Sequence, residues 1–408
     1  MLSFSDSLFL QEAKNTHMTH IEDKVLYGGV SGVRQAIFAL RDMRDMLGGS
    51  GGSVSVKWDG APAVFAGTDP RDGQFFVAKK GIFNKNPKVY KTDAEIDDDT
   101  SGDLNKKLKL ALKHLPSLGI KGVIQGDFLF DSSELKTKKI DGKQYVTFHP
   151  NTIVYAVPAE QSATIKKAKM GIVWHTTYTG RTFESMSASF GVDVSKLNKS
   201  SAVWSQDAFL RDVTNATMTK RETADVQKTL SQIGVLFNSI SGTTLRTLEG
   251  NQVLAQHIET FNNTFVRAGQ MPGNSTVHAK KLVAWITKKY KKEIDARKTA
   301  KGKGAQQAKL DALLSFFSPE NTENLIKMFE LQKLIVIAKL KLINKLNQLQ
   351  NIGTFVKTSK GYKVTGAEGY VAIDRIGGDA VKLVDRMEFS YNNFSPDIVK
   401  GWDNQARN

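Results

Sequence analysis

The chain has 408 residues, 40% of them hydrophobic and 24% charged, and this composition excludes wholesale disorder and leaves room for two or three domains. The absence of cysteine excludes disulfides, thiolate catalysis and cysteine-based zinc sites. Because 57 Lys and Arg residues face 41 Asp and Glu residues, the net charge is +16, which favours nucleic acid as a partner over a role in solubility alone.

Residues 1–50 are predicted to form an N-terminal helical segment. Apolar residues recur at helical spacing over residues 19–47. Thr19 and Glu22 are spaced as a capping box at the start of this helix, in which each side chain bonds the backbone of the other residue. Gly28 and the glycines that follow it interrupt the pattern, so the segment is expected as one helix or as two shorter helices.

Residues 51–200 are predicted to form an antiparallel α+β unit. Short runs of β-branched and aromatic residues alternate there with turns, which is typical of strands. The expected strands are residues 53–56, 63–66, 75–78, 123–130, 145–148, 152–157 and 172–178. One helix is expected at about residues 102–115, where leucines recur at helical spacing. Such a mixture indicates the α+β class.

Residues 201–352 are predicted to form a helical domain inserted into the sheet domain. They show long helical periodicities, and strand character returns only at residues 354–364 and 369–374, so residues 353–408 are expected to complete the sheet domain. Within the insertion, Trp285 and Tyr290 are interleaved with four lysines, Lys288, Lys289, Lys291 and Lys292. This pattern suits a surface that tracks a phosphate backbone and stacks on a base, although a solvated amphipathic face is its commoner origin.

No segment predicts contact with a membrane. Residues 1–10 carry Asp6 and lack a basic leader and an apolar stretch of signal-peptide length. The most apolar later run, residues 334–338, is followed closely by Lys339 and Lys341, so it cannot span a bilayer. The sequence therefore predicts a soluble, cytoplasmic protein and leaves its oligomeric state open.

The feature most informative about function is the motif Lys57-Trp58-Asp59-Gly60 at the end of a strand-like run. A lysine amine beside a carboxylate is a nucleophile for a phosphate, and a glycine lets backbone and phosphate approach closely. By itself the motif is more typical of a surface turn after a strand. Three further phrases accompany it in strand-like settings, namely Gly126-Asp127, Glu368-Gly369-Tyr370-Val371 and Val381-Lys382-Leu383-Val384.

The order of these motifs resembles that of the covalent nucleotidyltransferase superfamily, which comprises ATP-dependent DNA and RNA ligases and mRNA-capping guanylyltransferases. Residues 75–88 and 385–390 also resemble a bacteriophage-encoded branch of predicted ligases. The matching stretches lie at about residues 50–180 and 360–395, and nothing between them matches. The resemblance implies an antiparallel-sheet nucleotidyltransferase (adenylation) domain that uses ATP with Mg²⁺ or Mn²⁺ and forms a lysine–AMP intermediate.

The resemblance also implies a role for each site residue. Lys57 is the expected nucleophile, and Lys382 is expected to neutralise the charge that grows on the α-phosphate as pyrophosphate leaves. The residues expected to bind the nucleotide are Asp59, Gly60, Lys80, Asp127, Tyr155 and Glu368. Of these, Glu368 and Asp127 are also expected to hold the metal.

Three of these assignments have structural alternatives. Lys80 is expected to meet the ribose or the acceptor phosphate, or it is one lysine among many on a solvated strand. The ring of Tyr155 is expected to stack on the base, or it is a core tyrosine with a satisfied hydroxyl. Asp127 stands where relatives have glutamate, and its alternative is a strand-edge aspartate in a turn.

Other positions depart from the family's pattern. Val384 and Ile373 stand where relatives carry basic residues, and Arg375 or Lys363 is expected to substitute for the missing one at position 373. Pro62 stands where DNA ligases usually place arginine. No C-terminal oligonucleotide-binding (OB) barrel is expected after the last motif, although DNA ligases and capping enzymes normally append one.

The missing barrel and Pro62 favour an RNA-ligase-like enzyme that joins 5′-phosphate and 3′-hydroxyl ends of nucleic acid, with the inserted helices clamping the substrate. The alternatives are a DNA nick-sealing ligase and a GTP-using mRNA-capping guanylyltransferase. A further alternative, from a different class, is a non-catalytic nucleic-acid-binding phage protein with a degraded nucleotidyltransferase fold.

Overall fold

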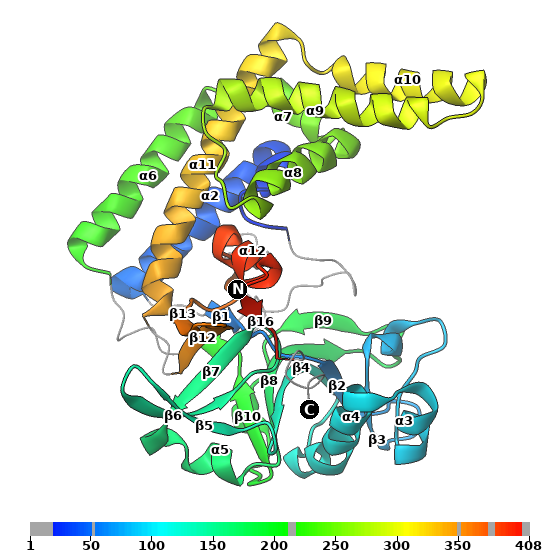
Figure 1. Cartoon of the computed structure of the whole chain (residues 1–408), viewed down its shortest axis with the longest axis vertical. Coiled ribbons are helices and arrows are strands. Elements are labelled where there is room, and N and C mark those ends of the chain that lie inside the picture. Colours follow the sequence, from blue (N-terminus) through cyan, green and yellow to red (C-terminus); the bar gives the residue numbers. More distant parts are fainter. Residues whose placement is uncertain (1–18, 51–53, 211–217, 349–351, 374–379, 402–408) are drawn as a thin grey trace, which may run out of the picture.

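The computed structural model describes residues 19–50, 54–210, 218–348, 352–373 and 380–401. Figure 1 shows three β-sheets gathered in the lower part of the molecule and long helices above them. The predicted mixed α+β class with antiparallel sheets is therefore confirmed. The strands that were predicted from runs of β-branched and aromatic residues are all present, because such side chains pack well on a pleated surface.

The first sheet brings together strands from three distant parts of the chain. In spatial order it consists of β11 (Phe209–Leu210), β1 (Val54–Lys57), β14 (Gly369–Ile373) and β15 (Ala380–Leu383). All neighbouring strands are antiparallel, and Lys57 pairs with Gly369 while Val371 pairs with Lys382. Lys57, Gly369 and Lys382 therefore lie near the same end of these three adjacent strands.

The second and third sheets each have six strands. The second consists, in spatial order, of β10 (Val203–Asp207), β8 (Met170–Thr179), β4 (Val123–Asp131), β2 (Ala63–Thr68) and β3 (Phe75–Ala78), and β9 (Ser187–Phe190) also pairs with β8. The third consists of β13 (Gly361–Val364), β12 (Gly353–Thr358), β7 (Ile153–Pro158), β6 (Lys143–Phe148) and β5 (Lys136–Ile140), and β16 (Ile398–Val399) pairs with β12. Only β10 and β8 are parallel among these pairs.

The first and second sheets are joined through Ala208, which lies between β10 and β11. Its backbone N–H donates to the carbonyl of Trp174 in β8 at 3.0 Å, and its carbonyl accepts from the N–H of Val56 in β1 at 2.6 Å. The chain thus passes from one sheet into the other at this point. The end of β1 that carries Lys57 is held next to the middle of β8.

Helices form the upper part of the molecule in Figure 1. The N-terminal segment forms α1 (Lys24–Tyr27) and α2 (Gly29–Asp45), and it breaks at Gly28, as one of the two expected forms has it. The inserted helices are α6 (Lys220–Asn238), α7 (Gly242–Glu249), α8 (Gln252–Arg267), α9 (Ser275–Asp295), α10 (Ala300–Leu314) and α11 (Pro319–Asn347). The remaining helices are α3 (Asp93–Asp99), α4 (Gly102–His114), α5 (Ala163–Lys167) and α12 (Arg386–Phe394).

One hydrophobic core joins the N-terminal helices, the inserted helices and the first sheet. Leu40 of α2, Ile335 of α11 and Tyr370 of β14 all lie in it and are fully buried. One face of the first sheet is therefore covered by helices. Because these helices supply the apolar cover of that sheet, the N-terminal and inserted helices pack together as one body with it. Residues 203–210 of the predicted helical domain form β10 and β11 instead and belong to the sheets.

Buried ion pairs connect the segment before α1 to helices α11 and α12. Lys339 of α11 forms an ion pair with Glu22 at 2.7 Å, and Arg386 of α12 forms one with Asp23 at 2.7 Å. Burial alone would raise the pKa of Glu22, but the charges of Lys339 and Arg386 outweigh it and lower the pKa to about 2. Burial raises the pKa of Asp23 to about 7.

This cluster corrects the prediction for the start of the first helix. The side chain of Glu22 bonds Lys339 and not the backbone of Thr19, so the expected capping box is wrong. The physical reason is that Lys339 is almost completely buried, and a buried ammonium without a carboxylate partner costs several kcal/mol. The pairing with α11 could not be foreseen from the local spacing of two residues.

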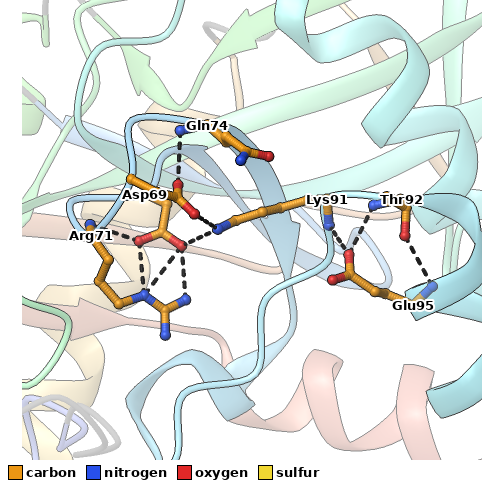
Figure 2. A network of polar contacts seen from close by, with 7 residues as sticks. Asp69, Arg71, Gln74, Lys91, Thr92 and Glu95 are labelled. Carbon is orange, nitrogen blue, oxygen red and sulfur yellow. Dashed lines mark hydrogen bonds and ion pairs between the residues drawn. The ribbon is translucent and has the colours of Figure 1, made fainter.

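A further buried carboxylate fastens the loop between β3 and α3 (Figure 2). Asp69, which follows β2, accepts hydrogen bonds from the guanidinium of Arg71 at 2.8 Å and the ammonium of Lys91 at 2.7 Å. Immediately after Lys91, Thr92 and Glu95 form a capping box at the start of α3. The loop that crosses this side of the second sheet is thus tied down where it enters α3.

Replacing Asp69 with asparagine is expected to destabilise the fold by about 2–3 kcal/mol at pH 7, because a buried acceptor for two cations loses its charge. Burial alone would raise the pKa of Asp69, but hydrogen bonds from Arg71 and Lys91 outweigh it and hold the pKa well below its usual range. A carboxyl of this kind adds stability above its unfolded-state pKa of about 3.9, and that stability is lost as the pH falls below this value.

Urea unfolding at pH 7 and at about pH 3 measures this effect, and the difference between wild type and variant should shrink at the lower pH. The Asp72→Asn variant is the matched control, because Asp72 also pairs with Lys91 but is more exposed than Asp69. It is expected to change stability little. A difference for Asp69→Asn that stays constant across this pH range would contradict the prediction.

Candidate functional site

A cavity of about 470 Å³ lies where the first and second sheets meet. Strands β1, β14 and β15 supply one part of its wall, and β2, β4, β8 and β9 supply the other. Of the residues predicted for the site, those that line it are Lys57, Asp59, Gly60, Lys80, Asp127, Glu368 and Lys382. The structure therefore gathers residues from distant parts of the chain around one cavity. Tyr155 is the one predicted site residue that does not line it.

Lys57 and Glu368 form an ion pair in this cavity. Glu368 directly precedes Gly369, the partner of Lys57 in the antiparallel register of β1 and β14, so the pairing of the strands sets the two side chains next to each other. The side chain of Lys57 is 36% exposed and that of Glu368 is 12% exposed. The amine is therefore within reach of a ligand that enters the cavity, while its carboxylate partner lies deeper.

The electrostatics of the site follow from its burial. Burial raises the pKa of Glu368, although the neighbouring charge of Lys57 acts in the opposite direction. Burial lowers the pKa of Lys382, and the positive charge of Lys57 adds to this effect. Lys57 and Lys382 thus lie near one carboxylate, Glu368, and this local excess of positive charge favours the binding of an anion.

Glu368 is positioned from behind by residues outside the cavity. The side-chain carbonyl oxygen of Asn347, at the end of α11, accepts hydrogen bonds from the Tyr370 hydroxyl at 2.6 Å and from the Ala367 N–H at 3.4 Å. The carboxylate of Glu388 in α12 accepts from the N–H of Gly366 at 3.1 Å. The inserted helices therefore help to set the geometry of the site, even though none of them lines the cavity.

Asp59 holds the turn after β1 in place. Its carboxylate accepts hydrogen bonds from the side-chain amide of Asn151 at 2.7 Å and from the N–H groups of Thr152 and Ile153 at 2.6 and 2.8 Å. Asp59 is 6% exposed, so its oxygens are occupied within the fold. We therefore interpret Asp59 as a residue that positions Lys57. The sequence had suggested that Asp59 contacts the nucleotide, but its carboxylate oxygens already accept hydrogen bonds from the protein.

Tyr155 lies behind the cavity wall and not in it. Its ring is 4% exposed and stacks between Trp58, at 4.8 Å between ring centroids, and Phe148, at 5.3 Å. Its hydroxyl accepts a hydrogen bond from the N–H of Asp59 at 2.6 Å. The expected stacking on a base does not fit this position because both faces of the ring are already covered, and the alternative of a core tyrosine with a satisfied hydroxyl describes it.

Other aromatic rings line the cavity. Phe83 and Tyr178 have ring centroids 4.9 Å apart, and Phe65 lies 5.6 Å from Tyr178. Phe83 belongs to the turn after β3, and Tyr178 belongs to β8. These rings give the cavity an apolar wall. Phe65 and Tyr178 are buried, so the partly exposed ring of Phe83 is the one at which a flat heterocycle could stack.

A β-bulge between β4 and β8 shapes the far wall. Gly126 pairs with Trp174 and Gln125 pairs with Thr176, so His175 is the extra residue. The bulge changes the alternation of β8, because Val173 and His175 line the cavity before it and Thr176 lines it after. His175 was not foreseen from the sequence, since a bulge leaves no reliable signal in the residue pattern.

Gly60 and Asp127 meet across this wall. A Cβ atom on Gly60 would lie 2.6 Å from the Cβ of Asp127, so only glycine allows β4 to come this close. The carboxylate of Asp127 is 22% exposed and lies 3.7 Å from Nε2 of His175. Asp127 thus points into the cavity beside an imidazole.

Lys80 and its neighbour Lys79 have different surroundings. Lys79 is bound to Asp99 at 3.0 Å, and Asp99 also accepts from Lys88 and Tyr90. Lys80 is exposed and lines the cavity. Of these two adjacent lysines, Lys80 is the one placed to meet an anion in the cavity.

The positions that depart from the family's pattern lie away from the cavity or outside the described residues. Val384 is buried, and a Cβ on Gly369 would lie 2.4 Å from its Cγ2, so Val384 packs against β14. Lys363 lies on β13 with its ammonium 5.1 Å from the ring of Tyr391, and it does not line the cavity. Arg375 lies outside the described residues.

The donors in the cavity fit a magnesium ion that is bound together with a nucleotide. Magnesium in such sites takes one or two protein carboxylates, and its other ligands are phosphate oxygens and water. Asp127 and Glu368 supply carboxylates here, although Glu368 is engaged by Lys57. Among the described residues no three His, Asp or Glu side chains gather as a metal-binding group, so phosphates would have to complete the coordination.

Within the part of the chain that the structure describes, no helix is both long and apolar enough to cross a membrane.

Comparisons with known proteins identify a family. No curated protein and no solved structure matches the sequence. Residues 15–397 match the family described as "Family of unknown function (DUF6267)", and the chain therefore belongs to that family.

Proposed function

We propose that the protein is an ATP-dependent polynucleotide ligase of the covalent nucleotidyltransferase type, which uses Lys57 as its nucleophile and acts on RNA in preference to DNA. The observation that carries this proposal is the pairing of Lys57 with Glu368 in a cavity that also contains Lys382. The volume of about 470 Å³ lies within the range of sites for small molecules. The partly exposed ring of Phe83 in the cavity suits stacking on a base.

The first step is the transfer of AMP to Lys57. The ammonium of Lys57 gives up a proton to the carboxylate of Glu368, with which it is in contact. Burial raises the pKa of Glu368 and so makes it a better proton acceptor. The lone pair of Nζ then forms a bond to the α-phosphorus of ATP, the bond to the bridging oxygen breaks, and pyrophosphate leaves with that electron pair. The remaining extra proton on nitrogen passes to solvent, which leaves a phosphoramidate.

Lys382 stabilises the charge that grows on the α-phosphate during this step. It is half-buried beside Lys57, where water screens its charge less than at the surface. Magnesium, when bound, supplies further neutralisation of the phosphate oxygens. In the later steps AMP passes from Lys57 to the 5′-phosphate of one strand, and the 3′-hydroxyl of another strand displaces it.

Incubation of the protein with magnesium and α-labelled ATP or GTP tests the proposal. Covalent label from ATP that resists alkali and is released by acid, as a phosphoramidate is, supports it. Label from GTP alone would favour a capping enzyme. No label with any divalent ion would overturn the proposal and favour a non-catalytic binding protein.

Strand joining then separates the two ligase alternatives. The preference for RNA rests on Pro62, which takes the place of the arginine usual in DNA ligases. Nicked duplexes of equal sequence, with RNA or DNA on each side of the nick, are the substrates. More efficient sealing of all-DNA nicks would favour the DNA ligase.

A further inference from the structure

Helices α9 and α10 form an antiparallel pair that projects sideways from the body of the molecule (Figure 1). Residues 275–314, which comprise this pair and its turn, are called the arm below. One side of α9 packs on the rest of the helices through Leu282 and Ile286, which are fully buried. The α10 helix lies at the outside of the molecule. The arm therefore presents most of its length to solvent.

The arm carries half of the net charge of the protein. Eleven Lys and Arg residues lie in it against Glu293, Asp295 and Asp311, so its net charge is +8 out of +16. Ten of these cations are exposed, namely Lys280, Lys281, Lys288, Lys291, Lys292, Arg297, Lys298, Lys301, Lys303 and Lys309. Within the arm, Lys281, Lys288 and Lys292 are spaced by seven and four residues and so follow one face of α9.

These cations differ from the lysines of the neighbouring helix α11. There, Lys327, Lys333, Lys341 and Lys345 all form ion pairs with carboxylates. Among the described residues, no carboxylate lies within ion-pair distance of the ten exposed cations of the arm. Like charges at such spacing repel one another and lower the stability of the helix, so solubility alone would be served better by a mixed surface.

The surface of the arm does not suit a membrane. A helix that lies in a membrane interface exposes a broad apolar face with large side chains. The apolar side of α9 is buried in the core instead, and Val277 is the only large hydrophobic residue of the arm that is well exposed. A polyanion bound through its phosphates requires nothing apolar and fits the chemistry of the arm better.

We infer that the arm is a clamp for the phosphate backbone of a nucleic acid. Its ammonium and guanidinium groups contact phosphates, and such contacts carry no information about the base sequence. Tyr290, which the sequence suggested as a stacking residue, is buried and shares a hydrogen bond with His257 at 3.1 Å. Trp285 lies under the ammonium of Lys289, whose nitrogen is 5.5 Å from the ring centroid. Stacking on bases is therefore not part of this surface.

The inference rests on the proposed function only in taking the bound polymer to be the substrate of the cavity. In this arrangement the cations of the arm, which lie outside the cavity, hold the polynucleotide while the cavity carries out the reaction. Removal of all inserted helices would not test it, since those helices also cover the first sheet. Charge changes on the exposed side of the arm leave that core intact.

The test compares a charge-reversal variant of the arm with a matched control. The arm variant is Lys288→Glu, Lys291→Glu and Lys292→Glu. The control is Lys138→Glu, Lys139→Glu and Lys143→Glu, which changes the net charge equally at exposed lysines of the β5–β6 hairpin. Fluorescence anisotropy with labelled RNA and DNA of about 30 nucleotides, single-stranded and duplex, measures Kd at several salt concentrations.

The arm variant is expected to bind at least about 10-fold more weakly than the control and to show a shallower dependence of Kd on salt. The variant with Gln at the same three positions should lie between wild type and the Glu variant. Equal binding of RNA and DNA by the arm variant and the control would overturn the inference. If the arm variant bound anionic vesicles or an acidic protein more weakly while its binding of RNA and DNA was unchanged, that result would overturn the inference as well. Covalent labelling with ATP in the absence of nucleic acid should be unchanged in all variants. The failure of labelling would therefore count against the proposed function, and the failure of this binding difference against the arm.

Discussion

Replacement of Lys57 by arginine is expected to abolish covalent labelling with ATP, a loss of more than about 10⁴-fold. Arginine keeps the positive charge and can keep the ion pair with Glu368, but its guanidinium does not lose a proton in proteins and cannot attack phosphorus. The alanine variant should lose labelling equally, since it also lacks the amine. The measurement is the amount of label bound to the protein after gel electrophoresis, followed by identification of the labelled peptide.

The arginine variant is the sharper of the two because it separates chemistry from folding. Loss of the ion pair in the alanine variant leaves Glu368 buried without its partner, so that variant is expected to be less stable as well. Thermal unfolding should show the arginine variant close to wild type. Label that persists on Lys57→Arg would place the nucleophile elsewhere. Among the described residues, Lys80 and Lys382 are the other lysines that line the cavity.

The second large effect is expected at Lys382. Replacement by methionine removes the charge while it keeps the length of the side chain, and the rate of AMP transfer should fall by about 10²–10³-fold, as for the loss of one group that stabilises developing charge. The KM for ATP should change less than kcat, because the interaction strengthens as pyrophosphate leaves. Single-turnover labelling at several ATP concentrations measures both quantities.

The pH dependence of labelling distinguishes this role from a structural one. Burial and the charge of Lys57 lower the pKa of Lys382, so its charged form is lost at a lower pH than for an ordinary lysine. The rate in wild type should therefore decline on the alkaline side as Lys382 loses its charge. Lys382→Arg, which stays charged, should recover part of the rate lost in the methionine variant and remove this alkaline decline. An unchanged alkaline decline in Lys382→Arg would assign it to another group.

Much of the sheet architecture could be predicted from the residue pattern. The expected strands at residues 63–66, 75–78, 123–130 and 172–178 correspond to β2, β3, β4 and β8, and the expected helix at about 102–115 corresponds to α4. Strands such as β9, β10 and β16 were not predicted. β9 and β16 have only four and two residues, and β10 ends in the polar run Ser205 to Asp207, so the strand pattern is weak there and pairing with neighbours determines the structure.

The candidate site was only partly predictable, for reasons that differ between residues. Glu368 and Lys382 were predicted through the resemblance of the motifs that contain them to those of a known superfamily, and the antiparallel register then brings them to Lys57. The burial of Tyr155 could not be foreseen, since a buried and a cavity-lining tyrosine have the same strand pattern around them. The bonds of Asp59 to residues 151–153 depend on how the third sheet meets the turn after β1. Such contacts between sheets have no signature in local spacing.

The position of β1 between β11 and β14 has a consequence for the synthesis of this protein. Val54 to Lys57 emerge from the ribosome long before their partners in β14 and the neighbouring β15. The first strand must therefore remain unpaired on one edge throughout that interval, which is a hazard for aggregation. The N-terminal helices and the inserted helices, which precede β14 in the chain, can shelter its apolar side in the meantime. Expression at low temperature, or together with chaperones that bind extended segments, should consequently raise the yield of correctly folded protein.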